Sequence, residues 1–294
     1  MKTDIFNFRR FGKYFASDIK TCWANFGLSL LTITIIIPVV LYLVLTTVNM
    51  LLTSSWEGPG MGFRLFAFGV AMLCTVLIMP VKTYGRITEK QYGSFWLTLP
   101  ASRLEKFISM FLLTCIIVPA VSTIIYLGMD AIICAIDHTC GQNLFSAAVG
   151  FFKNMGDIQE LTMNFVDENI TLEDASLVQK IIDQINSPML YIDEILQITL
   201  PFLLGALYFK SGKTAKTILV IFAFSTVTGI IATPVMERWS MELFDSLNEN
   251  PNVILTLFDN GFFKNLVLID TITDAIINIA LLTAIWFRIK TLKH

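Results

Sequence analysis

The segment YFKSGKTAK, residues 208–216, contains Gly-Lys-Thr, the end of a loop with which many nucleotide-binding proteins hold phosphates. Such a loop also needs a glycine five residues before Gly212, so that backbone N–H groups can wrap around the phosphates. Leu207 stands at that position, and the residues before it form an apolar helical pattern rather than a buried strand. We therefore expect Lys213 to lie in a short basic turn between two hydrophobic segments.

Two carboxylates, Asp270 and Asp274, lie one helical turn apart inside an apolar stretch. Carboxylates are costly inside a membrane, so such residues are candidates for function, for example in a proton relay. Both lie in the outer half of their stretch, on the side where other polar residues are expected. We predict that they line a structural outer polar cluster, with a proton relay as the alternative. The predicted cluster consists of Arg64, Asp130, Asp193, Glu194, Asp270 and Asp274.

Metal and nucleophile chemistry have little support in the sequence. His138 and Cys140 offer two ligand types but lack two further partners. No Gly-x-Ser-x-Gly or His-Glu-x-x-His signature is present. We expect no catalytic centre, no metal site and no cofactor in this chain, and we expect the five cysteines to be buried small hydrophobic residues rather than a disulfide framework. These cysteines are Cys22, Cys74, Cys115, Cys134 and Cys140.

The composition indicates an all-α integral membrane protein. Hydrophobic residues make up 55% of the 294 residues, charged residues only 15%, and the mean hydropathy is +0.68, which is outside the range of soluble domains. A helix needs about 20 mostly apolar residues to cross the hydrocarbon layer. The first apolar run is too long for a cleavable signal peptide, so we expect it to remain in the mature protein. Six transmembrane helices are expected, at roughly 26–52, 63–81, 107–136, 189–209, 216–236 and 264–287.

The distribution of Lys and Arg predicts the orientation of these six spans. On alternate sides of the spans, 16 of the 21 basic residues fall on one side and 5 on the other. Because cytoplasmic loops carry the positive excess, both termini are predicted to be cytoplasmic. The smaller group is Arg64, Lys153, Lys180, Arg238 and Lys264.

Residues 1–25 are predicted to form an amphipathic helix. Its apolar residues recur at spacings of three and four, whereas Arg9, Arg10, Lys13 and Lys20 lie mostly off that stripe. This pattern fits a helix in the cytoplasmic headgroup layer, and a simple extension of the first span is the alternative.

The cytoplasmic loop 82–106 separates the second and third spans of the region 26–136. We expect a short helix in it between Gly85 and Gly93. Ser102 and Glu105 form a predicted capping box, in which each side chain binds a free backbone N–H at the start of a helix. The third helix should then run to residue 136, about 51 Å, with a bend near Pro119.

Two further segments are expected on the outer side. Residues 137–188 contain two amphipathic patterns and should form a small helical extracytoplasmic insert. In the region 189–294, residues 237–263 should contain a pair of short helices in the outer leaflet, since neither is long enough to span.

This layout resembles the type-2 permeases of ATP-binding cassette (ABC) exporters. The amphipathic N-terminal helix, six spans with both ends inside, the structured loop after the second span and the short helices before the sixth are shared features. The run LPASRLEKF, residues 99–107, is similar to the Leu-Pro-x-Ser-x-x-Glu-Lys-Phe stretch that enters the third span in many bacterial members. In one respect the chain departs from the family, because the connection between its third and fourth spans runs to about 50 residues.

The resemblance implies a permease subunit in the cytoplasmic (inner) membrane of a bacterium. ATP would be bound and hydrolysed by a separate soluble ABC ATPase in two copies. A second permease chain, identical or different, and the lipid bilayer would be the other partners, with no role for nucleic acid. The loop would dock on the ATPase, through candidate coupling residues Tyr84, Arg86, Glu89, Lys90 and Tyr92.

Two functions from other classes stay open. One is an ion-coupled secondary transporter in which Asp270 and Asp274 would titrate. The other is a non-transporting membrane sensor or scaffold that would use the 137–188 insert to bind a ligand or protein.

Overall fold

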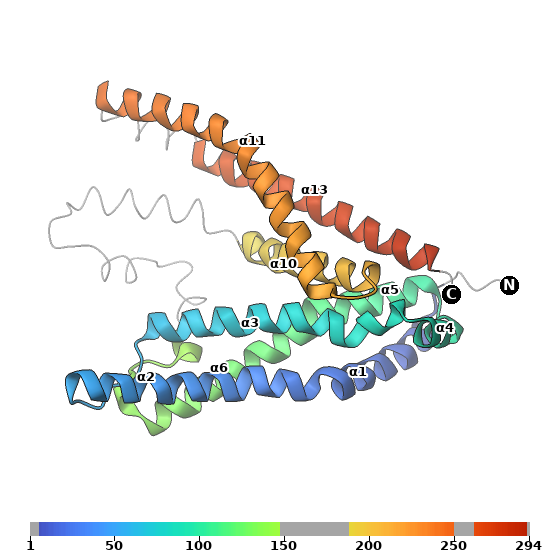
Figure 1. Cartoon of the computed structure of the whole chain (residues 1–294), viewed down its shortest axis with the longest axis horizontal. Coiled ribbons are helices and arrows are strands. Elements are labelled where there is room, and N and C mark those ends of the chain that lie inside the picture. The colour runs from blue at the N-terminus through green and yellow to red at the C-terminus, as the bar shows by residue number, and fades with distance from the viewer. Residues whose placement is uncertain (1–5, 148–187, 250–261, 293–294) are drawn as a thin grey trace. The chain divides into compact units, whose positions relative to one another are not determined.

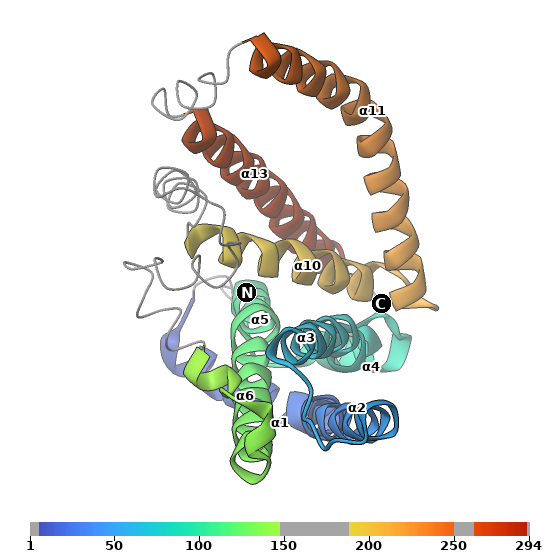
Figure 2. The same cartoon turned by 90° about the vertical axis from the view of Figure 1, so that its left-hand side faces the viewer.

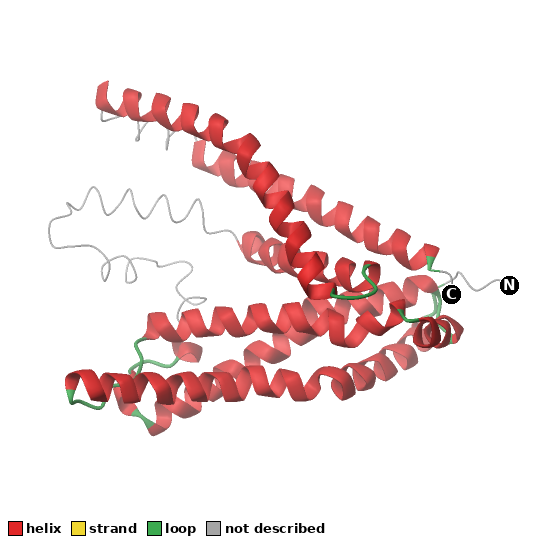
Figure 3. Ribbon diagram, viewed as in Figure 1, coloured by secondary structure: helices red, strands yellow, loops and turns green. Residues whose placement is uncertain are grey.

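The computed structural model describes residues 6–147, 188–249 and 262–292, and this part of the chain is helical with no strand (Figure 3). It divides into two units. In chain order (Figure 1) the elements are α1 (Phe8–Leu31), the π-helical turn η1 (Thr32–Ile36), α2 (Ile37–Thr53), α3 (Met61–Tyr84), the 3₁₀ turn η2 (Gly85–Thr88), α4 (Lys90–Thr98), α5 (Arg103–Phe111), the π-helical turn η3 (Leu112–Ile117), α6 (Val118–Ile136), the 3₁₀ turn η4 (His138–Cys140), α10 (Pro188–Tyr208), α11 (Lys213–Glu249) and α13 (Phe262–Thr291).

Several helices are long and apolar enough to cross a membrane, so the chain is a multi-pass membrane protein. The fourth expected span corresponds to α10, whose apolar section in the described chain, Ile195–Tyr208, is shorter than a spanning helix. The count of six therefore stays a prediction. Among the described residues the five candidate spans are Phe8–Leu52, Met61–Thr88, Arg103–Ile136, Lys213–Ile230 and Leu268–Thr291.

The N-terminal amphipathic segment is not a separate helix. From Phe8 the chain is helical without a break through η1 to Thr53, and the Asn7 side chain caps its start by accepting from the N–H groups of Arg9 and Arg10. The apolar side of α1 packs against α3 and α5, where Phe26 is 1% exposed. On the stripe that the sequence assigned to the lipid headgroups, Phe26 is buried but Phe8 and Trp23 are exposed, so the protein covers only part of it. The position of α1 relative to the membrane stays a prediction.

Two long helices contain a π-helical turn just before a proline. The turn η1 precedes Pro38, and the turn η3 precedes Pro119, where the sequence predicts a bend. Proline has no N–H to donate and its ring crowds the carbonyl four residues earlier. A locally wider helical turn accommodates both effects and redirects a helix.

The loop between α3 and α5 is more ordered than the sequence predicts. The chain tightens into η2 at the expected start, and α4 begins at Lys90 and continues beyond Gly93 to Thr98. The capping box is confirmed, because Ser102 Oγ accepts from Glu105 N at 3.2 Å and Glu105 Oε2 accepts from Ser102 N at 2.9 Å. The third span is confirmed as a helical run from Arg103 to Ile136.

The first unit comprises residues 1–155, 198–214 and 283–294, as far as they are described. Figure 2 shows α2, α3 and α6 side by side, and α1 packs on α3 and α5. Within this bundle Ile33, Ala71, Tyr126 and Leu144 form a buried cluster. The ends of α10 and α13 that belong to the unit contribute fully buried side chains, among them Leu203 and Ile289.

The second unit contains residues 156–197 and 215–282. Its helix α11 runs unbroken to Glu249 with Pro234 inside it, so the first of the two short helices expected within 237–263 is a continuation of the fifth span. Of the remaining expected features, residues 148–187 of the insert and 250–261 of the outer-leaflet pair lie outside the described residues. Exposed apolar side chains such as Leu219 and Phe222 give α11 the surface that a lipid environment requires.

Candidate functional site

The helix α4 has one face buried in the first unit and one face exposed. Trp96 is 4% exposed, and Ile87 of the preceding turn is 1% exposed. Arg86, Glu89 and Tyr92 lie together with the exposed Phe95 around an open recess. Burial raises the pKa of the Tyr92 phenol.

Lys106 fixes the end of α4. Its side chain is buried, and Nζ donates to the carbonyl of Trp96 at 2.7 Å and to that of Leu97 at 3.3 Å. The ammonium also lies 4.8 Å from the centroid of the Trp96 ring. The last carbonyls of a helix have no partner within it, and a cation there complements the helix dipole. Lys106 therefore holds α4 against α5.

Lys213 fixes the other end of the same loop. Its Nζ donates to the Gly85 carbonyl and to Thr88 Oγ1, and Ala206 O lies 3.5 Å away. Gly212 before it has a φ of 59°, a left-handed conformation that glycine adopts without strain. The Gly-Lys pair thus fits a turn at the start of α11, where the ammonium binds the loop between α3 and α4.

Glu105 joins the N-terminal helix to α5. Besides its role in the capping box, this fully buried carboxylate accepts from Arg10 Nη2 at 2.7 Å, from Arg10 Nε at 2.8 Å and from Asn7 N at 2.9 Å. The bidentate pairing fixes the geometry as well as the charge. Glu105 therefore caps one helix and anchors the start of another.

Asp18 is a buried acid that sequence reasoning missed. Its Oδ2 accepts from Tyr84 Oη at 3.0 Å and from Ser109 Oγ at 2.5 Å, which links α1, α3 and α5. Tyr84, predicted as a surface residue of the loop, is 2% exposed and belongs to this network instead. The sequence does contain a signal for this burial. Asp18 lies near Phe15 and Cys22, on the apolar side of a predicted amphipathic helix.

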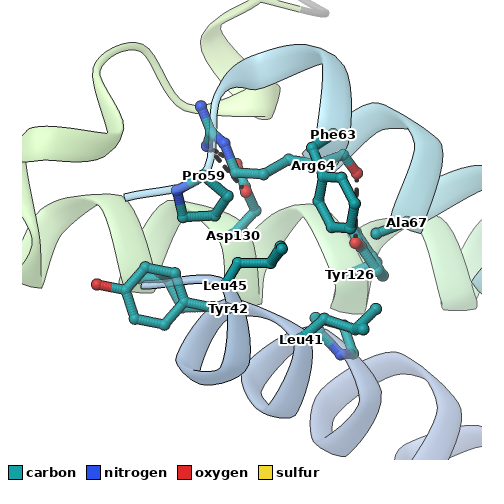
Figure 4. A pocket seen from close by; sticks show the side chains of 11 residues that line it. Leu41, Tyr42, Leu45, Pro59, Phe63, Arg64, Ala67, Tyr126 and Asp130 are labelled. Atoms are coloured by element: carbon teal, nitrogen blue, oxygen red, sulfur yellow. Dashed lines mark hydrogen bonds and ion pairs between the residues drawn. The ribbon is translucent and has the colours of Figure 1, made fainter. Parts of the chain in front are cut away.

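At the opposite end of the first unit, the structure brings together two members of the predicted outer polar cluster. Arg64 Nη1 donates to Asp130 Oδ1 at 3.0 Å, and both residues are buried (Figure 4). Arg64 Nη2 also binds the carbonyls of Cys140 and Gln142, at 3.0 and 2.7 Å, while Asp130 Oδ2 accepts from Leu144 N at 2.7 Å. The pair thereby holds the chain that follows α6.

A small cavity lies beside this ion pair. Its volume is about 20 Å³, and Tyr42, Phe63 and Tyr126 help to line it (Figure 4). A space of this size holds one water molecule. It is far smaller than the several hundred Å³ of a typical ligand pocket.

The other four acids of the predicted cluster belong to the second unit. Asp270 is exposed within that unit and Asp274 is partly buried, whereas the side chains of Asp193 and Glu194 lie outside what the structure describes. Arg64 and Asp130 are brought together within the first unit, and the rest of the cluster stays a prediction. Lys90 is likewise placed as the first residue of α4 without a described side chain.

The turn after α6 contains a second anchored acid. Asp137 accepts from the Thr139 hydroxyl at 2.6 Å, from Trp56 Nε1 at 3.1 Å and from the Tyr42 hydroxyl. Chiefly because of the Thr139 bond, the pKa of Asp137 is lowered to about 2. His138 beside it is exposed, and the described residues contain no group of three metal-ligating side chains.

Comparison of the chain with protein-family models, with curated proteins and with solved structures finds no match. The class that the fold defines is an all-helical, multi-pass membrane protein.

Proposed function

We propose that this chain is the membrane-spanning permease subunit of an ATP-driven exporter of the type-2 ABC kind. A soluble ATPase in two copies supplies the energy, and two permease chains, identical or different, form the pathway in the cytoplasmic membrane of a bacterium. This chain then needs neither a nucleotide site nor a catalytic centre of its own.

The proposal rests on the contacts that hold the loop containing α4. Two lysines hold the ends of the loop, the partly buried Lys213 at its start and the buried Lys106 at its end. Between them, Arg86, Glu89 and Phe95 are exposed around one recess. A short segment that is fixed at both ends and exposed between them can transmit the movement of a bound partner to the helices that hold it.

Charge favours a protein partner at this face. Arg86 and Glu89 offer both signs of charge, and the exposed Phe95 offers an apolar anchor. Aromatic and arginine side chains of this kind carry much of the binding energy of protein interfaces. Arg10 and Glu105 add a connection from α5 to α1, through which a movement of the loop reaches the N-terminal helix.

The test begins with the full chain purified in mild detergent from its native membranes. We expect an ATPase subunit to accompany it and ATP hydrolysis to be sensitive to vanadate. If the chain is isolated alone and inactive in repeated mild extractions, the proposal is wrong. An ion-coupled carrier would instead depend on pH, and that dependence would disappear in Asp270→Asn with Asp274→Asn.

The docking face is tested by charge reversal. We expect Arg86→Glu with Lys90→Glu to reduce ATPase retention and stimulation roughly tenfold without loss of folding, because like charges at an interface oppose binding. The matched control is Lys210→Glu with Lys290→Glu, which reverses two exposed charges on the same predicted side of the membrane. Equal retention and stimulation in the test variant and the wild type would reject α4 as the docking element.

A further inference from the structure

Cys134 and Cys140 meet at the end of α6. Cys134 lies in the last turn of this helix and Cys140 closes the turn η4, six residues later. The two thiols lie close enough for each to affect the pKa of the other. Both are free thiols in the structure and both are buried, at 7% and 6% exposure.

The buried Arg64–Asp130 pair holds the two cysteines in place. Arg64 Nη1 donates to Cys134 Sγ at 2.7 Å, and Nη2 of the same guanidinium donates to the Cys140 carbonyl at 3.0 Å. Gly58 packs closely against Cys140, since a Cβ at that position would lie 2.5 Å from Cys140 Sγ. The approach of the two sulfur atoms is therefore fixed by packing and by an ion pair.

The charge distribution predicts that this end of α6 lies outside the cytoplasm. The chain after α6 belongs to the side with 5 of the 21 basic residues. Outside the cytoplasm, disulfides form and persist, whereas cytoplasmic thiols are kept reduced. Two neighbouring thiols in that compartment can form a disulfide.

We propose that Cys134 and Cys140 form a disulfide in the mature protein. The oxidant is a disulfide of the thiol-exchange type. One cysteine thiolate attacks it, which releases the first thiol of the oxidant and forms a mixed disulfide. The second cysteine then attacks the mixed disulfide and releases the second thiol of the oxidant. The two cysteine thiols lose two electrons and two protons, and the oxidant becomes two thiols. This inference depends on the orientation of the chain and is independent of the proposed transport function.

Burial determines when the bond forms. It raises the pKa of the Cys140 thiol to about 11, so little thiolate exists at neutral pH once the turn has folded. Exchange therefore takes place before the turn closes, and the completed bond is shielded from reductants.

The bond would strengthen an anchor between two segments. Inside the closed ring, Asp137 binds Trp56, and Thr139 Oγ1 accepts from Gly58 N at 2.8 Å. The disulfide thus fastens the connection between α2 and α3 to the end of α6.

Peptide mapping of the full chain tests the proposal. The chain, purified without reductant, is denatured in detergent with N-ethylmaleimide and cleaved before aspartate, which separates residues 130–136 from 137–156. We expect these two peptides to be joined, and to separate and become alkylated only after reduction. In the same sample, Cys22, Cys74 and Cys115 should be alkylated without reduction and serve as internal controls.

The result that overturns the inference is alkylation of both Cys134 and Cys140 before reduction. Cys140→Ser checks the pairing, because the Cys134 peptide should then appear alone and alkylated without reduction. A Cys134 peptide that is instead linked to another cysteine in the wild-type chain would also overturn it.

Discussion

Replacement of Lys106 by Met is expected to release the end of α4. The substitution keeps a long apolar side chain in the buried site and removes the ammonium. The carbonyls of Trp96 and Leu97 then lose a donor 2.7 and 3.3 Å away, and the Trp96 ring loses a cation 4.8 Å from its centroid. The change acts on the local stability of α4 more than on the whole fold.

The size of the effect follows from these contacts. A hydrogen bond from a charged donor contributes about 1.5–3 kcal/mol, and a cation–π contact adds about 0.5–1 kcal/mol. Against this, the variant no longer has to bury an ammonium, which offsets part of the loss. We expect a net cost of about 2 kcal/mol, which is roughly a 30-fold rise in the opening equilibrium of α4.

Amide hydrogen exchange measured by mass spectrometry reports this opening directly. Peptides that cover Lys90–Thr98 should exchange roughly 30-fold faster in Lys106→Met than in the wild type. The matched control is Arg103→Met, which removes an exposed cation from the same helix, one turn earlier. Exchange in α4 that is unchanged in Lys106→Met, or that rises equally in Arg103→Met, would refute the assignment of Lys106 as the anchor.

Two further predictions concern the outer end of the first unit. Asp130→Asn leaves the buried Arg64 without its counter-charge and should lower the free energy of unfolding by about 3–5 kcal/mol, measured by denaturation in detergent; the exposed Glu57→Gln should change it by less than about 0.5 kcal/mol. An Asp130→Asn variant as stable as the wild type would show that the pair is not needed. Asp137 has a folded-state pKa of about 2, below its ordinary value of 3.8, so its contribution is present above about pH 4 and is lost as the pH falls toward 2. A thermal melt from pH 6 to pH 3 should therefore show a loss of stability that is smaller in Asp137→Asn, and identical profiles would contradict the role given to the Thr139 bond.

Local signals in the sequence determined the helical character and several boundaries. Apolar stretches of sufficient length predict membrane helices regardless of what surrounds them, and the capping box of Ser102 and Glu105 fixes the start of α5 within four residues of chain. Apolar spacing also predicted a helix before the first span. The same spacing could not say whether protein or lipid covers its apolar face, because both environments favour the same pattern.

The junctions between helices were less predictable. The sequence offered no signal near residue 237 that would end the fifth span, and α11 continues to Glu249. The short helix of the loop was expected to end at Gly93, yet glycine is tolerated inside α4 where Trp96 and the buried Ile87 hold the segment in place. Tertiary packing overrides a weak local preference of this kind.

Only the tertiary structure decided which partners the charged side chains bind. Lys213 reaches Gly85 and Thr88 across more than a hundred residues of chain, and Arg64 reaches Asp130 across 66 residues. The side chains that bury a charge come from different helices, so no spacing along one helix encodes the pair. The sequence determined that this chain enters a membrane as helices, because hydrophobic length is a local property; the packing decided its anchors, because a buried charge is stable only where another element supplies its partner.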